Sequence, residues 1–205
     1  IHMFGAIVKL RMFAAASRAK LDAFATCFAA QPRNLRTIVF CNFLCEMDAF
    51  EQRLRQHHPT VEILRISGDT SLDLRQDVVD RFMYPGDDLD HDVVLLMQIK
   101  SGGVGLNLQK AQRVYITSPS WNATDEMQAL ARAHRIGTTS RVVATRFVTE
   151  DTIEAYMHLK QQHKLHEASN ILNDERILES LRDCDNTPIP WRETVAMFGS
   201  DVFDT

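Results

Sequence analysis

Five short apolar segments rich in β-forming residues alternate with helical stretches, and this alternation restricts the fold more than any other feature of the chain. The segments are residues 37–41, 61–66, 93–97, 113–117 and 142–148. Apolar residues recur with helical spacing at 43–57, 71–83, 123–135 and 149–164. Repeated strand–helix units predict a doubly wound, mainly parallel α/β sheet with helices on both faces.

The two ends of the chain differ from this central pattern. Residues 4–30 show helical spacing, and Ser17 and Ser71 stand where N-caps are expected. The last forty residues are acidic and predict a helical appendage. We therefore predict a helical lead-in at 1–30, one α/β domain at 31–165 and an appendage at 166–205.

Four loops are expected to meet at one edge of the sheet, because the carboxyl ends of parallel strands share an edge and ligands bind there. These loops hold Asn42, residues 68–70, residues 100–105 and residues 118–122.

Charge is unevenly distributed along the chain. The net charge of −4 alone argues against a nucleic-acid binder, but residues 100–148 carry seven Lys or Arg and only two Asp or Glu. Residues 149–205 carry five and twelve, respectively. A local basic field suits a polyanion, since local potential governs attraction. The alternative is a basic stretch of ordinary surface.

A glycine-rich segment, residues 100–108, follows the third apolar segment directly. Glycines at three of four positions (102, 103 and 105) let backbone approach a bulky anion, and loop amides can hold phosphate. No Gly-Lys-Ser/Thr follows them, so this is no P-loop. A tight turn is the alternative.

Three polar side chains share one face of the helix predicted at 123–135. Gln128, Arg132 and Arg135 are spaced at i, i+4 and i+7. Guanidinium groups bind phosphate oxygens well, and neither arginine has a carboxylate four residues away. A solvated basic helix face is the alternative.

Five motifs occur in an order that resembles one family. They are TIVFCNF, SGDTS, KSGGVGLNL, PSWN and QALARAHRIG, within about residues 17–165. This stretch resembles the C-terminal helicase lobe of the Swi/Snf-type ATPases of helicase superfamily two. The resemblance implies a RecA-like lobe of a nuclear, ATP-driven translocase of the chromatin-remodelling or DNA-repair type, which acts on double-stranded DNA, either naked or nucleosomal.

The resemblance also implies roles for individual residues. Arg135 and Arg132 match the arginine fingers that reach the γ-phosphate, with Arg135 as the first choice and Arg132 as the second. Nucleotide-side roles fall on Gln128, Gly103, Gly105 and Asn107, and contacts with the DNA backbone fall on Lys100, Asn42 and Ser101. Trp121 is expected to pack under the glycine-rich segment.

The family has two lobes with ATP and Mg²⁺ between them, and the first lobe carries the phosphate loop and the metal-binding box. Neither motif occurs in this sequence. We therefore expect the first lobe as a partner, no metal held by this chain, and no hydrolysis by the chain alone. We also expect no membrane segment.

Several positions depart from the family pattern, which usually has Asp at Ala131, Gln at Thr138, Asp at Ser118, Pro at Ala123 and Ser-Gln at Cys41-Asn42. These departures leave a second hypothesis open, a degenerate, non-catalytic module that binds DNA or protein. An unrelated nucleotide-binding domain is disfavoured, because no acidic ribose partner follows the glycines at the usual distance.

Overall fold

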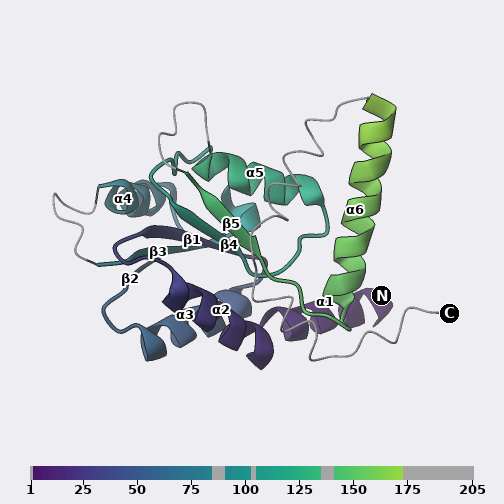
Figure 1. The fold of residues 1–205 in the computed structure, drawn as a ribbon, viewed down its shortest axis with the longest axis horizontal. Coiled ribbons are helices and arrows are strands. Elements are labelled where there is room, and N and C mark those ends of the chain that lie inside the picture. Colours follow the sequence, from purple (N-terminus) through teal and green to yellow (C-terminus); the bar gives the residue numbers. More distant parts are fainter. Residues whose placement is uncertain (1, 85–90, 103–104, 135–140, 173–205) are drawn as a thin grey trace.

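The structure is a computed structural model that describes residues 2–84, 91–102, 105–134 and 141–172. In these ranges one sheet lies between two layers of helices (Figure 1). The predicted α/β class with a parallel sheet is confirmed.

Every strand pair in the sheet is parallel, and the strand order is β2-β3-β1-β4-β5. The strands are β1 (Arg36–Cys41), β2 (Glu62–Ile66), β3 (Val93–Gln98), β4 (Arg113–Ile116) and β5 (Val143–Arg146). β1 is central, since Thr37 pairs with Val94 of β3 on one side and Arg113 of β4 on the other. The carboxyl ends of all strands therefore meet at one edge, called the carboxyl edge below.

Six helices and one short 3₁₀ turn are described around the sheet. They are α1 (His2–Ala15), α2 (Arg18–Ala30), α3 (Leu44–His57), α4 (Leu72–Met83), η1 (Ile99–Gly102), α5 (Ala123–Ala133) and α6 (Ile153–Leu172). The helices α4 and α5 cover the upper face of the sheet in Figure 1, and α2 and α3 cover the lower face.

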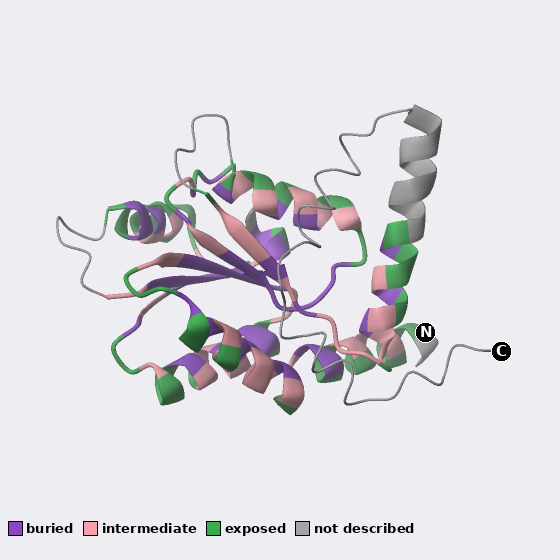
Figure 2. Cartoon of the chain, viewed as in Figure 1, coloured by how far each residue is buried: buried purple, intermediate pink, exposed green. Residues whose placement is uncertain are grey.

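The sheet is buried on both faces, as Figure 2 shows by its purple strands. Successive side chains of a strand point to opposite faces. Ile38 and Phe40 of β1 enter the upper core, and Val39 and Cys41 enter the lower core. This explains why the strands have nearly continuous apolar sequences rather than alternating ones.

The two predicted N-caps have different outcomes. The Ser71 hydroxyl accepts a hydrogen bond from the Leu74 amide at 3.4 Å, so this cap is confirmed. Ser17 precedes α2 with extended backbone, but its side chain makes no capping bond. The predicted side-chain cap of α2 is therefore wrong.

Helix α6 starts later than the pattern predicts. The Thr152 hydroxyl donates to the Thr149 carbonyl at 2.6 Å and accepts from the Glu154 amide at 3.1 Å, and Asp151 has a φ of 53°. This turn delays the helix to Ile153. α6 then continues past residue 165, the predicted domain boundary, which stays a prediction because residues 173–205 lie outside the described part.

Candidate functional site

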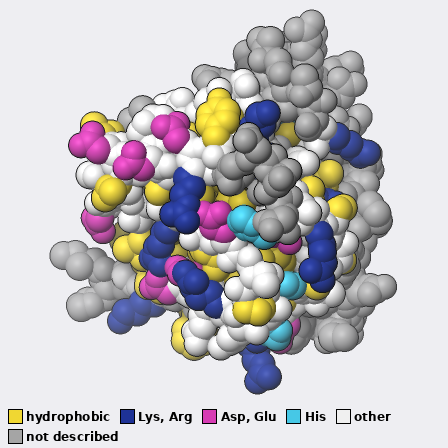
Figure 3. All heavy atoms as spheres, turned by 90° about the vertical axis from the view of Figure 1, so that its left-hand side faces the viewer, with side chains coloured by type: hydrophobic (Ala, Val, Ile, Leu, Met, Phe, Trp, Pro, Cys, Tyr) yellow, Lys and Arg dark blue, Asp and Glu magenta, His cyan; other side chains and the backbone are white. Residues whose placement is uncertain are grey.

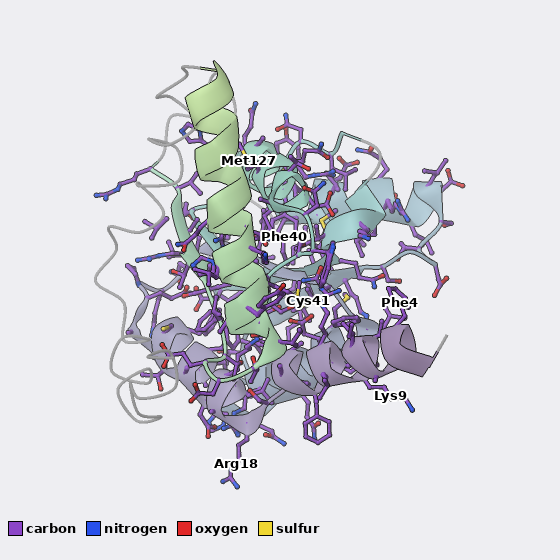
Figure 4. The ribbon with its side chains drawn as sticks, turned by 90° about the vertical axis from the view of Figure 1, so that its right-hand side faces the viewer. Phe4, Lys9, Arg18, Phe40, Cys41 and Met127 are labelled. Atoms are coloured by element: carbon purple, nitrogen blue, oxygen red, sulfur yellow. The ribbon has the colours of Figure 1, made fainter. Side chains whose placement is uncertain are left out.

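The carboxyl edge brings together loops that are far apart in the sequence. Figure 4 views this edge with α6 in front, and with Phe40 and Cys41 at the end of β1 behind it. The Asn42 side chain donates to the Ser118 carbonyl at 2.9 Å and accepts from the Ser120 hydroxyl at 3.1 Å. Both ends of the Asn42 amide are therefore used to join the β1 and β4 loops.

A buried carboxylate, Glu46, holds the same region from α3. Its oxygens accept from the backbone amides of Asn42 at 2.8 Å and Phe43 at 3.2 Å, and from the Thr117 hydroxyl at 2.6 Å. Burial raises the pKa of Glu46, and the positive charge of Lys20 opposes that rise. Sequence reasoning missed Glu46, although an acidic residue in the first turn of a helix is a usable signal.

An ion pair between Lys20 and Glu154 closes the lower side of this edge. The Lys20 Nζ donates to both oxygens of Glu154 at 2.6 and 2.5 Å, and both side chains are 2% exposed. Burial lowers the pKa of Lys20, and Glu154 opposes that shift. The pair fastens the first turn of α6 to α2, and no local pattern could have indicated it, because its members lie 134 positions apart.

Arg75 organises the upper loops of the edge. Its guanidinium donates to the carbonyl oxygens of Ser101 at 2.6 Å, Thr70 at 2.8 Å and Ser67 at 3.1 Å. The side chain thus ties the SGDTS turn to η1, where the glycine-rich segment begins. The Ser101 hydroxyl faces inward and donates to the Gln98 carbonyl at 2.7 Å.

The residues predicted to be functional in the glycine-rich segment include three exposed ones and one that the structure does not describe. Lys100, Gly105 and Asn107 are exposed, and a Cβ added at Gly105 would meet nothing within 4 Å. Gly103 lies outside the described residues.

Helix α5 lies against the downstream part of this segment. The Arg132 carbonyl accepts from the Leu108 amide at 3.1 Å, which links the two predicted phosphate-facing elements. Arg132 is half-buried, and burial lowers the pKa of its guanidinium. Gln128 is exposed one turn earlier, and Arg135 lies outside the described residues.

The last residue of the PSWN element caps α5, and Pro119 and Ser120 before it are buried. The Asn122 side chain accepts from the Thr124 amide at 3.4 Å, as an N-cap does. Trp121 is 57% exposed, so the expectation that it packs under the glycine-rich segment is wrong.

The described basic residues of 100–148 do not all lie on one surface. Lys100 follows β3 at the carboxyl edge, Arg113 begins β4 at the opposite edge, and Arg146 pairs with Glu126 at 2.8 Å. Figure 3 faces that opposite edge, on the left of Figure 1, and shows Lys and Arg side chains dispersed among other types. A parallel strand separates its two ends by its own length, so a basic stretch of sequence need not form one basic field.

No cluster of three or more His, Cys, Asp or Glu side chains in the described ranges could hold a metal ion. No described helix is long and apolar enough to span a membrane.

Comparison with known proteins gives consistent matches. The model of the helicase conserved C-terminal domain family matches residues 19–137. The DNA repair protein RAD5 of Yarrowia lipolytica is 35% identical over 146 residues, which are 71% of this chain and 14% of that protein. The TATA-binding protein-associated factor mot1 of Aspergillus fumigatus is 34% identical over 141 residues, 68% of this chain and 7% of that protein.

A solved structure agrees with these matches. The crystal structure of the C-terminal part of the Fun30 ATPase domain superposes with a TM-score of 0.54 at 34% identity, over 61% of this chain and 38% of that one. The chain thus spans only 7 to 14% of the length of the two curated relatives named above.

Proposed function

The chain belongs to the helicase conserved C-terminal domain family, in the Swi/Snf-type branch of superfamily two, and from this premise we propose that it is the second motor lobe of an ATP-driven translocase on double-stranded DNA. The observation that carries this proposal is the family match over residues 19–137, because it includes both the glycine-rich segment and the helix with Arg132. A repair or remodelling role, and with it a nuclear location and naked or nucleosomal DNA as substrate, is the use that the relatives suggest.

On the nucleotide side, Arg135 and Arg132 would stabilise charge that develops on the γ-phosphate. The hydrogen bond between the Arg132 carbonyl and the Leu108 amide supports this assignment, since it holds the finger helix against the glycine-rich segment. Gln128, Gly105 and Asn107 are exposed beside these elements and, with Gly103, would order the same surface.

ATP with Mg²⁺ is the cofactor that the family implies, and ATP supplies the phosphoanhydride bond that is hydrolysed. Guanidinium and backbone amide donors suit phosphate oxygens. The described residues offer such donors but no carboxylate cluster for a metal ion. We therefore assign phosphate contacts to this lobe and the Mg²⁺ to the first lobe, without which the chain is expected to be inactive.

On the DNA side, Lys100 is exposed where β3 reaches the carboxyl edge, and we assign it a phosphate contact. The Asn42 amide and the Ser101 hydroxyl already bond within the chain. Their proposed part is to hold the loops that present Lys100 to the DNA backbone.

A second candidate function is a degenerate lobe that binds DNA or protein without supporting hydrolysis. The specific observation in its favour is that motif positions such as Ala131 and Thr138 depart from the family pattern. Substitution at the arginines separates the two candidates.

The deciding experiment measures DNA-stimulated ATP hydrolysis by the full-length protein that contains this lobe. Arg135→Ala and Arg132→Ala should lower kcat, since an arginine finger contributes about 10³- to 10⁵-fold in GTPases. Arg18→Ala, whose side chain is 94% exposed on α2, is the matched control and should keep the wild-type rate. Unchanged rates in both finger variants would favour the non-catalytic module.

The DNA assignment has its own test in the salt dependence of affinity. Lys100→Ala should reduce the slope of log K against log salt by about 1, because one phosphate contact is lost. An unaltered slope would remove Lys100 from the DNA interface.

A further inference from the structure

Helix α6 contacts the rest of the lobe through an unusually polar stripe. Among residues 153–162, the part of α6 whose burial the structure describes, the buried positions are Glu154, Met157 and Gln161, at 1%, 3% and 4% exposure. A surface helix normally buries an apolar stripe. Two of these three side chains are polar, so their partners, and not apolar packing alone, define how α6 sits.

Gln161 reaches the start of α5. Its side-chain amide donates to the Ser120 carbonyl at 2.6 Å and to Glu126 Oε1 at 3.0 Å. In Figure 4, Met127, the residue after Glu126, lies on α5 behind α6. The Gln161 contact therefore joins α6 to the first turn of α5, the helix that carries Arg132.

Glu126 is the centre of this junction. It is 1% exposed, its Oε1 also accepts from the Ser120 amide at 2.7 Å, and its Oε2 pairs with Arg146 of β5 at 2.8 Å. Arg146 in turn contacts His158 of α6 at 3.3 Å. One buried carboxylate thus connects α5, α6, β5 and the loop before α5.

The far end of α5 is held separately. Helix α5 has only 11 residues and is about 16 Å long at 1.5 Å per residue, so a displacement of one end also displaces the other end. Near its end, the Arg132 carbonyl accepts from the Leu108 amide. A shift of the Glu126 end would change where the Arg132 side chain points.

We propose that Gln161 is a positioning residue for nucleotide hydrolysis: through Glu126 it fixes the orientation of α5, so that the placement of α6 controls the alignment of Arg132. This inference rests on the proposed function, in which Arg132 faces the nucleotide. Gln161 itself touches no reacting atom. Whatever displaces α6 would withdraw the Gln161 contact and lower the rate without changing DNA affinity.

The test uses the full-length protein and DNA-stimulated hydrolysis at saturating DNA. Gln161→Ala should lower kcat between about 10- and 100-fold, the size of effect expected from a misplaced catalytic group. The KM for ATP and the Kd for DNA should stay near wild type. Lys160→Ala, at the exposed position before Gln161 on the same helix, should keep the wild-type kcat, because its side chain lies over Tyr156 and not at the Glu126 junction.

A double-mutant cycle with Arg132→Ala distinguishes positioning from simple loss of structure. If Gln161 acts through Arg132, Gln161→Ala should have no further effect in the Arg132→Ala background. Gln161→Met, which keeps the side-chain volume, guards against a variant that fails to fold, and a melting curve reports the folded fraction.

Each other outcome overturns the inference. Equal loss of kcat in both backgrounds would assign Gln161 a structural role only, and no loss in the wild-type background would remove its role altogether. If Arg132→Ala itself leaves kcat unchanged, the finger assignment of Arg132 fails first, and this inference fails with it. A loss for Arg132→Ala but none for Gln161→Ala would reject the inference and leave the proposed function standing.

Discussion

The two faces of the sheet are covered by different kinds of side chain. The lower core is aromatic, with Phe24 in edge-to-face contact with Phe50 at 4.9 Å and with Tyr115 at 5.3 Å. The upper core is mostly aliphatic and includes Leu106 and Leu108 from the glycine-rich segment. The lower face has helices only, whereas the upper face combines helices with a non-helical connection.

On the lower face, the residues that pack the core are distinct from the residues assigned to function. On the upper face, core residues and residues assigned to function are neighbours in the sequence. Among the described residues, none that we assign to nucleotide or DNA lies in the lower core. On the upper face, buried Leu106 and Leu108 flank exposed Asn107, and buried Ala133 follows Arg132. Substitutions in the lower core should therefore change stability alone, and substitutions on the upper face should change stability and activity together.

The largest effect is expected for Phe24→Ala in the lower core. Removing a fully buried ring that contacts four other rings should lower the free energy of unfolding by about 3–5 kcal/mol. Urea unfolding of the 205-residue chain measures this loss. ATP hydrolysis by the full-length variant, measured where it stays folded, should equal wild type, and a lower kcat there would break the distinction between the faces.

The next effect is expected for Lys20→Met. It leaves Glu154 buried without its cation and should cost about 3 kcal/mol. Lys20→Met combined with Glu154→Leu should recover most of that loss, since paired apolar replacement of a buried ion pair is often nearly neutral. The same denaturation experiment measures both variants, and a double variant as unstable as Lys20→Met would show that the pair is needed for more than charge balance.

Parallel topology and the order of the elements were predictable, because β-branched apolar runs and helical periodicity are local signals. The start of β5 was misplaced by only one residue, at Val143 instead of 142. The start of α6 was missed, because it depends on the Thr152 hydroxyl bonds and on the unusual φ of Asp151. Such a turn competes with helix and leaves no periodic trace.

Residues of the candidate site could be proposed from the sequence only where their pattern lies within one short segment. Arg132 could be proposed from the sequence because a stripe on one helix is a local pattern. Glu126, Lys20 and Glu154 were missed, because an acidic or basic residue on a helix predicts a solvated surface until its distant partner is known. Buried ionic contacts between elements are properties of the fold and not of any sequence window.

Arg75→Ala should produce a smaller effect on the upper face, about 2 kcal/mol, because a charged donor to several carbonyl groups is lost from a half-exposed position. Arg75→Lys is the matched variant and should restore only part of the loss, since an ammonium cannot reproduce the guanidinium fork. Hydrogen exchange should rise at the Thr70 amide, which bonds the Ser67 carbonyl. Unchanged exchange there would contradict the role of Arg75 in holding this turn.

The pH dependence of Glu46 gives a further test at the carboxyl edge. Its pKa in the folded state is raised above the ordinary value of 4.5. At a pH between the ordinary and the raised pKa, the folded chain therefore keeps a proton that the unfolded chain releases. This contribution favours folding at low pH and is lost as pH rises through the raised pKa. The stability of the wild type relative to Glu46→Gln should therefore fall as the pH rises through the raised pKa, and a difference in urea midpoint that stays constant with pH would contradict this prediction.

The smallest effects come from the two serines before α4 on the upper face and α2 on the lower face. Ser71→Ala removes a long capping bond and should cost about 0.5–1 kcal/mol. The Ser17 hydroxyl is buried and has no hydrogen-bond partner among the described residues, so Ser17→Ala should be neutral or slightly stabilising. Both variants share one chemistry, so their difference in thermal midpoint isolates the capping bond from helix propensity. Equal losses would mean that Ser17 caps α2 in solution through a bond that its rotamer here does not make.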